Sequence, residues 1–443
     1  RRVLFRSKPG SNAWAVSAAH TAGGGALVAS DMHLGLRVPA VWYRARLQVT
    51  GAVPFEAVGV TLPGVPAMVV GSNGKIAWAF TNSYGDWLDV RGLDCDTAAG
   101  VYYTPEGRQR FKTGRERIEV LRGDPVAEPV LESPLGVVVK REPGPSGSGE
   151  TCWLARWLAT EPGATTLGSI DLPRMTSVGE VLALAPSVGI PHQNLLVGDR
   201  AGHIAWTIAG RIPRGDRGPE TPAPVAWRGP DEAPRILDPE VGRLWSANAR
   251  MVDGPLEQVL GNDEAASGMG YDYGARAHQI RDGLLALAKP ATPADMLAIQ
   301  LDDRAVFLER WQRLLLATLD EEALRNHPKR AELKRLVAAW TPRAEVGSVG
   351  YRMVRGFRDG TRDAVWGMIT GALGAGQGSR PVSLFEGSLW RLVTEQPPHL
   401  LTSEHPDWRS FLLEQADAVV ADAEAACGKL ERCTWGLRNT ARI

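Results

Sequence analysis

The sequence predicts an α+β protein in which a strand-rich N-terminal part precedes a helical segment. Between Ser11 and about Val90, short apolar runs alternate with turns that contain glycine, proline or asparagine, a pattern typical of antiparallel strands. From about residue 276, the apolar residues recur at the three- and four-residue spacing of amphipathic helices. These two periods indicate sheets first and a helical excursion afterwards, over about 276–345.

The strands are separated by recognisable turns. Strands are predicted at Trp14–Ala18, Ala26–Ser30, Arg46–Gly51, Val58–Leu62, Met68–Gly71 and Ile76–Phe80. Further strands are predicted over 99–142, and a second tight hairpin over Asn194–Gly210, around the turn D-R-A-G.

The helical part begins with a clear start signal. Thr292, Pro293 and Asp295 supply a capping hydroxyl, a first-turn proline and an early acid. Amphipathic helices are predicted to follow at Ala305–Leu319 and Glu321–Trp340. The glycine-rich stretch Gly371–Ser379 has no strand before it, so we predict a loop there.

Composition and charge restrict the class of protein. Of the 443 residues, 44% are hydrophobic and 23% are charged, which is typical of a globular protein. Fifty basic and fifty acidic residues cancel, so no electrostatic field favours nucleic acid or an anionic membrane surface. No apolar run approaches the roughly 18 residues of a membrane-spanning helix. We therefore expect no nucleic-acid partner and no membrane span.

The cysteines leave two alternatives. Cys95, Cys152, Cys427 and Cys433 are too few for a disulfide scaffold. None occurs in a C-x-x-C pair, which argues against a zinc site. Cys427 and Cys433 are placed to pair if the protein is exported, and free buried thiols are the equal alternative.

Several common catalytic motifs do not occur. The sequence contains no G-x-S-x-G, no H-E-x-x-H and no phosphate-binding P-loop. An ordinary α/β-hydrolase with a nucleophile elbow is therefore disfavoured. If the protein is an enzyme, its nucleophile lies in another context.

Ser11 offers such a context, because it follows Gly10 at the start of the first predicted strand. A serine hydroxyl needs a base beside it to become a good nucleophile. The α-amino group of a serine at the beginning of a chain serves as that base, since its pKa of about 7.7–8.0 is close to the operating pH. Such a group forms only if the Gly10–Ser11 bond is cut. The alternative is an ordinary turn followed by a strand.

A series of further motifs decides between these alternatives. They are, in order, Gly10–Val16 (GSNAWAV), Ser30–Gly35 (SDMHLG), Val38–Leu47 (VPAVWYRARL), Leu62–Pro66 (LPGVP), Gly71–Asn82 (GSNGKIAWAFTN), Asp86–Asp89 (DWLD), Ser246–Arg250 (SANAR) and Gly274–Ile280 (GARAHQI). In this order they resemble the β-chain of the penicillin acylase (penicillin amidase) family, a branch of the N-terminal nucleophile hydrolases. The resemblance covers most of 11–310.

The resemblance implies a fold and a division of the chain. The expected fold is the αββα four-layer sandwich of these hydrolases, with the helical excursion added. Residues 1–10 are then a spacer remnant or a non-native leader, and 11–280 form the sheet core. Residues 281–345 form the helical segment, and 346–443 are the remaining part of a β-chain truncated at its C-terminus. The expected partner is an α-chain from the same precursor, giving a heterodimer, in the periplasm or secreted, although no signal peptide is visible.

The resemblance also assigns roles to five residues. Ser11 is the nucleophile, with its α-amino group as base, and His33 is expected near Ser11 Oγ, where it orients the hydroxyl. The backbone N–H of Asn82 and the side chain of Asn248 are the expected donors to the oxyanion. Arg276 is expected to organise the site around Asn248. Each role has an alternative. His33 is then a structural histidine and Asn82 a turn residue. Asn248 is a strand-end cap and Arg276 a solvated charge at the start of a helix.

A structural calcium ion is the one cofactor that the resemblance implies, with no catalytic cofactor. Its expected ligands are Asp86, Asp89 and the carbonyls of Leu88 and Pro213, since calcium prefers oxygen. Another aspartate is expected from 260–272, where Asp263 and Asp272 both remain candidates. The alternative is a pair of surface aspartates.

The acyl pocket and the activity are the last expectations. The pocket residues that the resemblance implies are Leu34, Tyr43, Ala67, Met68 and Phe80, and core packing explains the same residues equally well. The expected activity is hydrolysis of a linear N-acyl amide, such as a penicillin-type side-chain amide, an N-acyl homoserine lactone or an acylated lipopeptide. The alternative is a catalytically silent, unprocessed domain that only binds a small-molecule ligand or a partner.

Overall fold

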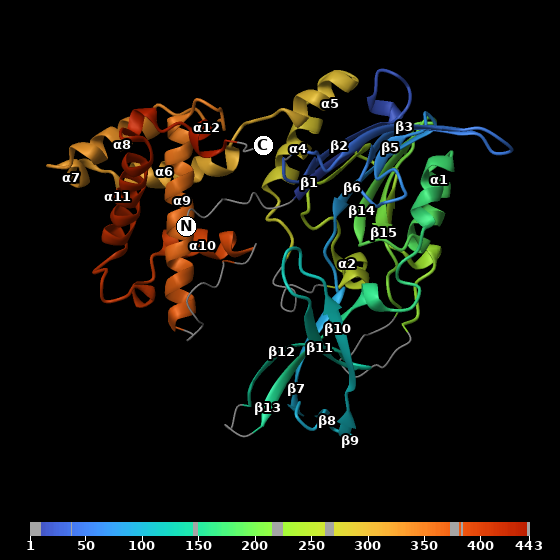
Figure 1. The fold of residues 1–443 in the computed structure, drawn as a ribbon. Coiled ribbons are helices and arrows are strands. Elements are labelled where there is room, and N and C mark those ends of the chain that lie inside the picture. Colours follow the sequence, from blue (N-terminus) through green and yellow to red (C-terminus); the bar gives the residue numbers. More distant parts are fainter. Residues whose placement is uncertain are drawn as a thin grey trace. The chain divides into compact units, whose positions relative to one another are not determined.

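The structure, a computed structural model, describes residues 10–36, 38–144, 149–214, 225–261, 270–372, 381 and 384–440. The chain divides into two units, which we describe one at a time (Figure 1). The sheet unit comprises the residues up to Leu34, Trp42–Tyr271 and Leu287–Pro293. The helical unit comprises Gly35–Val41, Asp272–Ala286 and the residues from Ala294 onward.

The chain enters the sheet unit through a small sheet of three antiparallel strands in the order β17–β1–β2. Its strands are β1 (Gly10–Val16), β2 (Leu27–His33) and β17 (Arg243–Ser246). Strand β1 therefore lies in the middle, between a neighbour in the sequence and a strand from more than 200 residues further on. This central position gives the first residues of β1 partners on both sides.

A seven-stranded antiparallel sheet, in the order β16–β15–β14–β6–β5–β4–β3, packs against the small sheet. Its strands are β3 (Tyr43–Val49), β4 (Phe55–Thr61), β5 (Val70–Ser72), β6 (Ile76–Asn82), β14 (Gln193–Asp199), β15 (Ile204–Ala209) and β16 (Arg235–Leu237). The hairpin predicted over Asn194–Gly210 is confirmed as β14 and β15. The predicted early strands are also present, with boundaries shifted by a few residues.

A second seven-stranded antiparallel sheet forms the lower part of the sheet unit in Figure 1, in the order β10–β11–β12–β13–β7–β8–β9. Its strands are β7 (Leu88–Asp96), β8 (Val101–Thr104), β9 (Gly107–Arg110), β10 (Lys112–Ile118), β11 (Val126–Ser133), β12 (Gly136–Pro143) and β13 (Glu150–Trp157). Every residue of β10 is exposed, whereas Cys152 and Leu154 of β13 are fully buried.

Small side chains allow the three-stranded sheet and its larger neighbour to pack face to face. Ala13 and Ala15 of β1 lie in one buried cluster with Ala79 of β6 and Leu196 of β14. Gly198 of β14 marks the closest approach, because an added Cβ there would lie 2.7 Å from the Cβ of Ala26 and 3.0 Å from a methyl group of Val28. This interface forms one core of the sheet unit, and the first residues of β1 lie at its edge, directly before Ala13.

The opposite face of the same seven-stranded sheet is covered by helix α1 (Val178–Leu184) and the short turn Gly168–Arg174. The period of two along β6 divides its side chains between the two faces. Trp78 and Phe80 pack under α1 with Val181, while Ala79 packs against the three-stranded sheet. The fold is therefore α+β, as predicted.

The helical unit is built around a separate core. Its helices are α4 (Ala275–Leu285), α5 (Pro293–Gln300), α6 (Glu309–Thr318), α7 (Glu321–Leu324), α8 (Pro328–Ala338), α9 (Val349–Ala372), α10 (Phe385–Glu395), α11 (Trp408–Cys427) and α12 (Trp435–Arg438); the short α2 (Gly254–Leu260) belongs to the sheet unit. The predicted start of α5 at Pro293 is confirmed. Trp311, Phe357 and Phe411 are fully buried where α6, α9 and α11 meet.

The helices extend well beyond residue 345, where the expected helical segment ends. The reason is visible in α9, whose buried residues Tyr351, Val354, Phe357 and Val365 recur at helical spacing. Two residues of the predicted glycine-rich loop, Gly371 and Ala372, still belong to α9. The rest of that stretch to residue 379 lies outside the described residues.

All four cysteines are paired. Cys95 of β7 forms a disulfide with Cys152 of the neighbouring strand β13. Cys427, at the end of α11, pairs with Cys433. Of the two alternatives for Cys427 and Cys433, the structure shows the disulfide.

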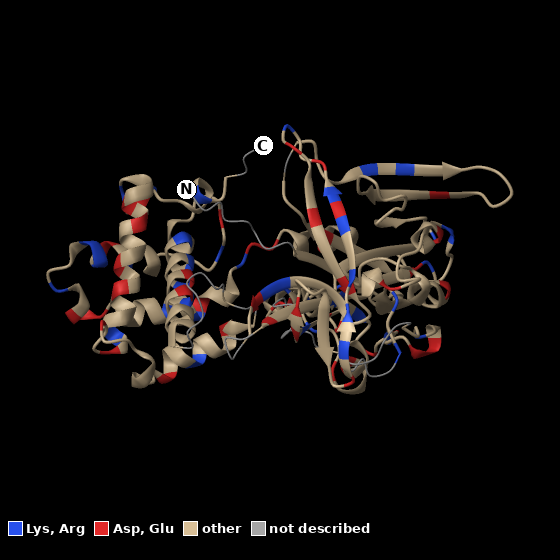
Figure 2. Cartoon of the chain, turned by 60° about the horizontal axis from the view of Figure 1, so that its bottom comes forward, with Lys and Arg blue, Asp and Glu red and all other residues tan. Residues whose placement is uncertain are grey.

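Charge is mixed over the surface of both units. Figure 2 shows Lys and Arg beside Asp and Glu along the helices and along the outer strands, so neither sign dominates in that view. This agrees with the zero formal net charge. In the described part of the chain, no helix has the length and apolarity that crossing a membrane requires.

Candidate active site

Ser11 is the second residue of β1, and its side chain faces the interior of the sheet unit. In the register of β1 and β2, Ser11 lies opposite Met32. Because side chains alternate along a strand, Ser11 shares its face with Ala13 and Ala15, which pack against the large sheet. Ser11 is 9% exposed.

Asn248, two residues after β17, is the side chain that the structure brings to Ser11. The main-chain N–H of Ser11 donates to Asn248 Oδ1 at 2.7 Å, and Asn248 Nδ2 lies 3.5 Å from Ser11 Oγ. The backbone of Asn248 is left-handed, with φ at 64°, a conformation that asparagine tolerates better than most residues. Asn248 is only 3% exposed, so its amide is buried next to the nitrogen and the hydroxyl of Ser11.

Asn82, at the end of β6, meets Asn248 through its carbonyl group. Asn248 Nδ2 donates to the Asn82 main-chain oxygen at 3.0 Å. The main-chain N–H of Asn82, which the resemblance implies as a donor to the oxyanion, stays a prediction. The contact is explained by burial, because a buried amide N–H costs free energy unless it finds an acceptor, and the Asn82 oxygen is beside it. The side chain of Asn82 is exposed and accepts from Gln193.

His33 is not at Ser11 Oγ, which corrects the expectation. The register places His33 opposite Gly10, one position from Ser11 and therefore on the other face of β1 and β2. There His33 Nε2 lies 3.0 Å from Asp31 Oδ2 and 3.3 Å from Asn12 Nδ2. The sequence alone does not give this result, because it requires the register of β1 against β2.

A group of buried polar residues beneath Asn82 was missed by the sequence analysis. Asn194 of β14 donates through Nδ2 to Thr81 Oγ1 at 3.1 Å and to the Asn82 oxygen at 3.3 Å. Its Oδ1 accepts from the indole N–H of Trp206 at 3.0 Å. Thr81 Oγ1 also lies 2.7 Å from Ser246 Oγ of β17. The available signal was Asn194 itself, a polar residue directly before the apolar run Leu195–Val197.

Arg276 lies in the first turn of α4, in the helical unit. Its guanidinium donates to Asp272 Oδ2 at 2.7 Å, and Asp272 Oδ1 accepts from the N–H of Tyr273 at 2.9 Å. The carboxylate of Asp272, one of the two candidates for a further calcium ligand, thus accepts a hydrogen bond on each oxygen. The other candidate, Asp263, lies outside the described residues.

The other expected calcium ligands lie around the start of β7 and at Pro213. Asp86 and Asp89 flank Leu88 at the start of β7, and the carbonyl of Pro213 accepts from Arg228 Nε at 3.1 Å. Among the residues that the structure describes, no three His, Cys, Asp or Glu side chains are grouped so as to hold a metal. The expected donors, carboxylates and main-chain carbonyl oxygens, are of the type that calcium prefers.

The expected acyl-pocket residues do not gather at Ser11. Met68 and Phe80 pack in the core under α1, on the face of the large sheet that is turned away from β1. Tyr43 and Leu34 are exposed, and Ala67 is buried beside Met68 in the sequence. For Met68 and Phe80, the structure shows core packing, because the period of two in β6 puts Phe80 and Ala79 on opposite faces.

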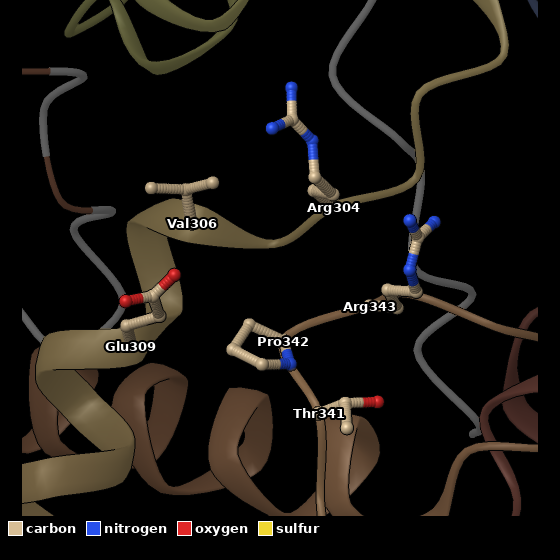
Figure 3. A pocket seen from close by; sticks show the side chains of 6 residues that line it. All are labelled: Arg304, Val306, Glu309, Thr341, Pro342 and Arg343. Atoms are coloured by element: carbon tan, nitrogen blue, oxygen red, sulfur yellow. The ribbon is translucent and has the colours of Figure 1, made fainter.

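A small hollow of about 240 Å³ lies in the helical unit, away from these residues in the sequence. Figure 3 shows its lining side chains, which are Arg304, Val306, Glu309, Thr341, Pro342 and Arg343. Both arginines are already neutralised, Arg304 by Asp302 and Arg343 by Asp303. The arginines of the hollow are therefore not free to recognise an anion.

Comparison with known proteins gives the family. The sequence model of the penicillin amidase family matches residues 2–443. Acyl-homoserine lactone acylase QuiP of Pseudomonas aeruginosa is 27% identical over 327 residues, which is 69% of this chain and 37% of the relative. Penicillin acylase 2 proenzyme of Pseudomonas sp. strain SE83 is 28% identical over 363 residues, which is 79% of this chain and 44% of the relative. The chain thus spans less than half the length of these relatives.

The fold has a solved counterpart. The thermostable penicillin G acylase of Alcaligenes faecalis superposes with a TM-score of 0.68 over 96% of this chain and 80% of the other chain, at 16% identity. At that identity, the likeness concerns the fold alone. Together with the match of the family model over nearly all residues, it leads to one conclusion: the chain belongs to the penicillin amidase family.

Proposed function

We propose that this protein hydrolyses a linear N-acyl amide, with Ser11 as nucleophile after cleavage of the Gly10–Ser11 bond. The observation that carries the proposal is the pairing of Ser11 with Asn248, whose buried amide lies 2.7 Å from the Ser11 nitrogen and 3.5 Å from its hydroxyl. One side chain thus contacts both the future base and the nucleophile. Both relatives described above are named as acylases, which supports the same class of reaction.

The reaction runs in two stages. The Ser11 hydroxyl oxygen attacks the acyl carbon while its proton passes to the α-amino group of Ser11. That proton then goes to the amine of the substrate, the C–N bond breaks, and an ester of Ser11 remains. Water, deprotonated by the same α-amino group, attacks the ester carbon. The C–O bond to Ser11 then breaks, the proton returns from the α-amino group to Ser11 Oγ, and the carboxylic acid leaves. Each tetrahedral intermediate carries an oxyanion that requires an oriented N–H donor.

Asn248 Nδ2 is the donor that we assign to this oxyanion. In the structure, Asn248 Nδ2 donates to the Asn82 carbonyl. During the reaction it must therefore donate to the oxyanion in addition to this carbonyl or in place of it. The Asn82 N–H is our second assigned donor. Arg276 is kept as a candidate organising residue, on the basis of the sequence resemblance alone.

The substrates that we propose share one chemistry, an acyl chain joined to an amine through an unstrained amide. N-acyl homoserine lactones and penicillin-type side-chain amides meet this description, as do acylated lipopeptides.

We further propose that the active form pairs with an upstream α-chain of the same precursor, in the periplasm or outside the cell. Calcium binding is part of the proposal as well, and titration calorimetry of the full-length protein with calcium tests it.

The experiment that tests the proposal uses the full-length gene product, made as wild type, Ser11→Ala and Ser30→Ala. Ser30 is the matched control, because it lies on the same face of the β1–β2 pair and has no assigned role. Intact mass and N-terminal sequence report cleavage, and release of nitroaniline from hexanoyl-, dodecanoyl- and phenylacetyl-nitroanilide reports hydrolysis. We expect a new N-terminus at Ser11 and hydrolysis in the wild type and in Ser30→Ala.

Ser11→Ala should show neither cleavage nor hydrolysis. Hydrolysis that persists in Ser11→Ala would refute the nucleophile. An uncut Gly10–Ser11 bond with no hydrolysis in the wild type would instead favour the alternative of a domain that only binds its ligand.

A further inference from the structure

We propose that Asn194 is a positioning residue for Asn248, and that it acts by fixing the main-chain carbonyl of Asn82. The inference deepens the proposed function and rests on the role of Asn248 given there. Asn194 is in β14, is 4% exposed and has no contact with Ser11 among its hydrogen bonds. It would therefore act through another residue.

The amide of Asn194 is held in one orientation. Its Oδ1 faces the indole N–H of Trp206 at 3.0 Å, and an indole nitrogen can only donate. Turning the amide by half a rotation would place NH2 against that N–H and an oxygen against the Asn82 carbonyl. Both contacts would be repulsive, so Trp206 determines that Nδ2 points toward Asn82.

The Asn82 carbonyl is the point at which two buried amides meet. It accepts from Asn194 Nδ2 at 3.3 Å and from Asn248 Nδ2 at 3.0 Å. A carbonyl oxygen has two lone pairs, and two amide donors occupy them. The direction of this carbonyl consequently fixes where Asn248 Nδ2 lies, and with it the position of Oδ1 against the Ser11 nitrogen.

A second route connects Asn194 to the same residue. Asn194 Nδ2 donates to Thr81 Oγ1, which lies 2.7 Å from Ser246 Oγ. Thr81 and Ser246 are fully buried, and Ser246 precedes Asn248 by two residues. Because β6 and β17 belong to different sheets, these hydroxyls join the two sheets directly below the site. Hydrogen bonds in such a water-free network are strong and directional.

The alternative is that this hydrogen-bond network only satisfies buried polar groups and has no effect on the site. Kinetic measurements distinguish this structural role from a positioning role. We compare Asn194→Ala with Asn73→Ala in the full-length protein. Asn73 is a matched control, because its Nδ2 also donates to two acceptors, here the main-chain carbonyls of Pro173 and Met175, in a turn of the same unit. Rates are divided by the fraction of chains that begin at Ser11, so that cleavage and turnover are measured separately.

We expect Asn194→Ala to lower kcat about tenfold or more, which is within the coupling measured for residues of one hydrogen-bond network. KM should change by less than about threefold, because Asn194 touches no substrate. Asn73→Ala should lower the melting temperature and leave kcat unchanged. In an Asn248→Gly background, where the amide that Asn194 positions is gone, Asn194→Ala should have no further effect on kcat.

An unchanged kcat in Asn194→Ala, or the same loss with and without the Asn248 side chain, would overturn the positioning role while leaving the proposed function intact. Full activity of Asn248→Gly would instead overturn the proposed role of Asn248 and the positioning role with it. If Asn194→Ala does not fold, Trp206→Phe provides the second variant, because it keeps an aromatic side chain, although a smaller one, and removes the N–H that orients the amide. It should lower kcat in the presence of Asn248 and have no effect in Asn248→Gly.

Discussion

At the scale of single residues, Asn248 combines two properties that few residue types share. Its backbone is left-handed, which asparagine and glycine adopt at low cost. Its side chain donates and accepts at the same time, toward Asn82 and Ser11. Glycine would satisfy the backbone alone, and alanine would satisfy neither requirement. The two substitutions therefore separate the conformational role from the chemical role.

We predict that Asn248→Gly keeps the backbone conformation but loses about 10²- to 10³-fold in kcat, the usual effect of removing one oxyanion donor. Asn248→Ala should lose a similar factor in kcat and be roughly 1 kcal/mol less stable than Asn248→Gly, because its Cβ is strained at positive φ. Steady-state kinetics and urea denaturation measure the two effects. Equal stability of the glycine and alanine variants would contradict the conformational part.

At the scale of elements, the pairing of strands decides which side chains share a face. His33 follows Asp31 and Met32 in β2, and the register with β1 places it opposite Gly10. A shift of one residue would have brought it to the face of Ser11. The same rule applied to β6 separates Ala79 from Phe80. Sequence motifs therefore identify these residues, and strand register assigns them to a site or to the core.

Contacts between helical elements include one carboxylate with a large change in pKa. Asp302 accepts from Gln279 of α4 and from Arg304. Partial burial raises the pKa of Asp302, but the hydrogen bonds from Arg304 and Gln279 outweigh it and bring the pKa from 3.8 down to about 2. A carboxyl whose pKa is lower in the folded state stabilises that state above the unfolded pKa. This contribution is lost as the pH falls from about 3.8 to about 2.

We predict that Asp302→Asn lowers the melting temperature at pH 5, and that the difference from wild type shrinks below pH 4 and disappears near pH 2. Circular dichroism of both proteins over this pH range provides the measurement. Asp282→Asn is the control, because this exposed aspartate of α4 forms only surface ion pairs, which contribute little. A difference for Asp302→Asn that stays constant down to pH 2 would rule out the linkage.

At the scale of the whole molecule, the chain consists of two units, each with its own core and its own disulfide. Cys95 and Cys152 lie in a buried cluster of the outer sheet, and Cys433 lies in the core of the helical unit. The first disulfide closes a loop with a sequence separation of 57 residues, and the second a loop with a separation of 6. Longer loops lose more chain entropy on closure, so the first bond should stabilise its unit more.

We predict that replacing both Cys95 and Cys152 by alanine costs about 4 kcal/mol of stability, and that replacing both Cys427 and Cys433 costs about 2 kcal/mol, from loop-closure entropy. Scanning calorimetry measures the change, and near-ultraviolet and far-ultraviolet dichroism show whether the sheet or the helical signal melts earlier. The first pair should affect the sheet signal and the second pair the helical signal. A larger loss from the second pair would contradict the entropic account.

Much of this organisation could be predicted from the sequence. The change from strand to helix period, the hairpin over Asn194–Gly210 and the start of α5 at Pro293 are present as predicted, because each depends on local preference and turn chemistry. The family also follows from ordered motifs. The helices after residue 345 were not predicted, because the resemblance assigns that region to the β-chain without its secondary structure, although the buried positions of α9 have helical spacing.

By itself, the sequence determined the α+β class, the family and the identity of Ser11 and Asn248 as partners, since motifs record residue types and their order. Only the tertiary structure decided that His33 faces away from Ser11, that Phe80 packs under α1, and that Asn194 supports the Asn82 carbonyl. The physical reason is that faces and buried contacts depend on strand register and on the packing of two sheets, which join residues more than 100 positions apart. No local pattern in the chain carries that information.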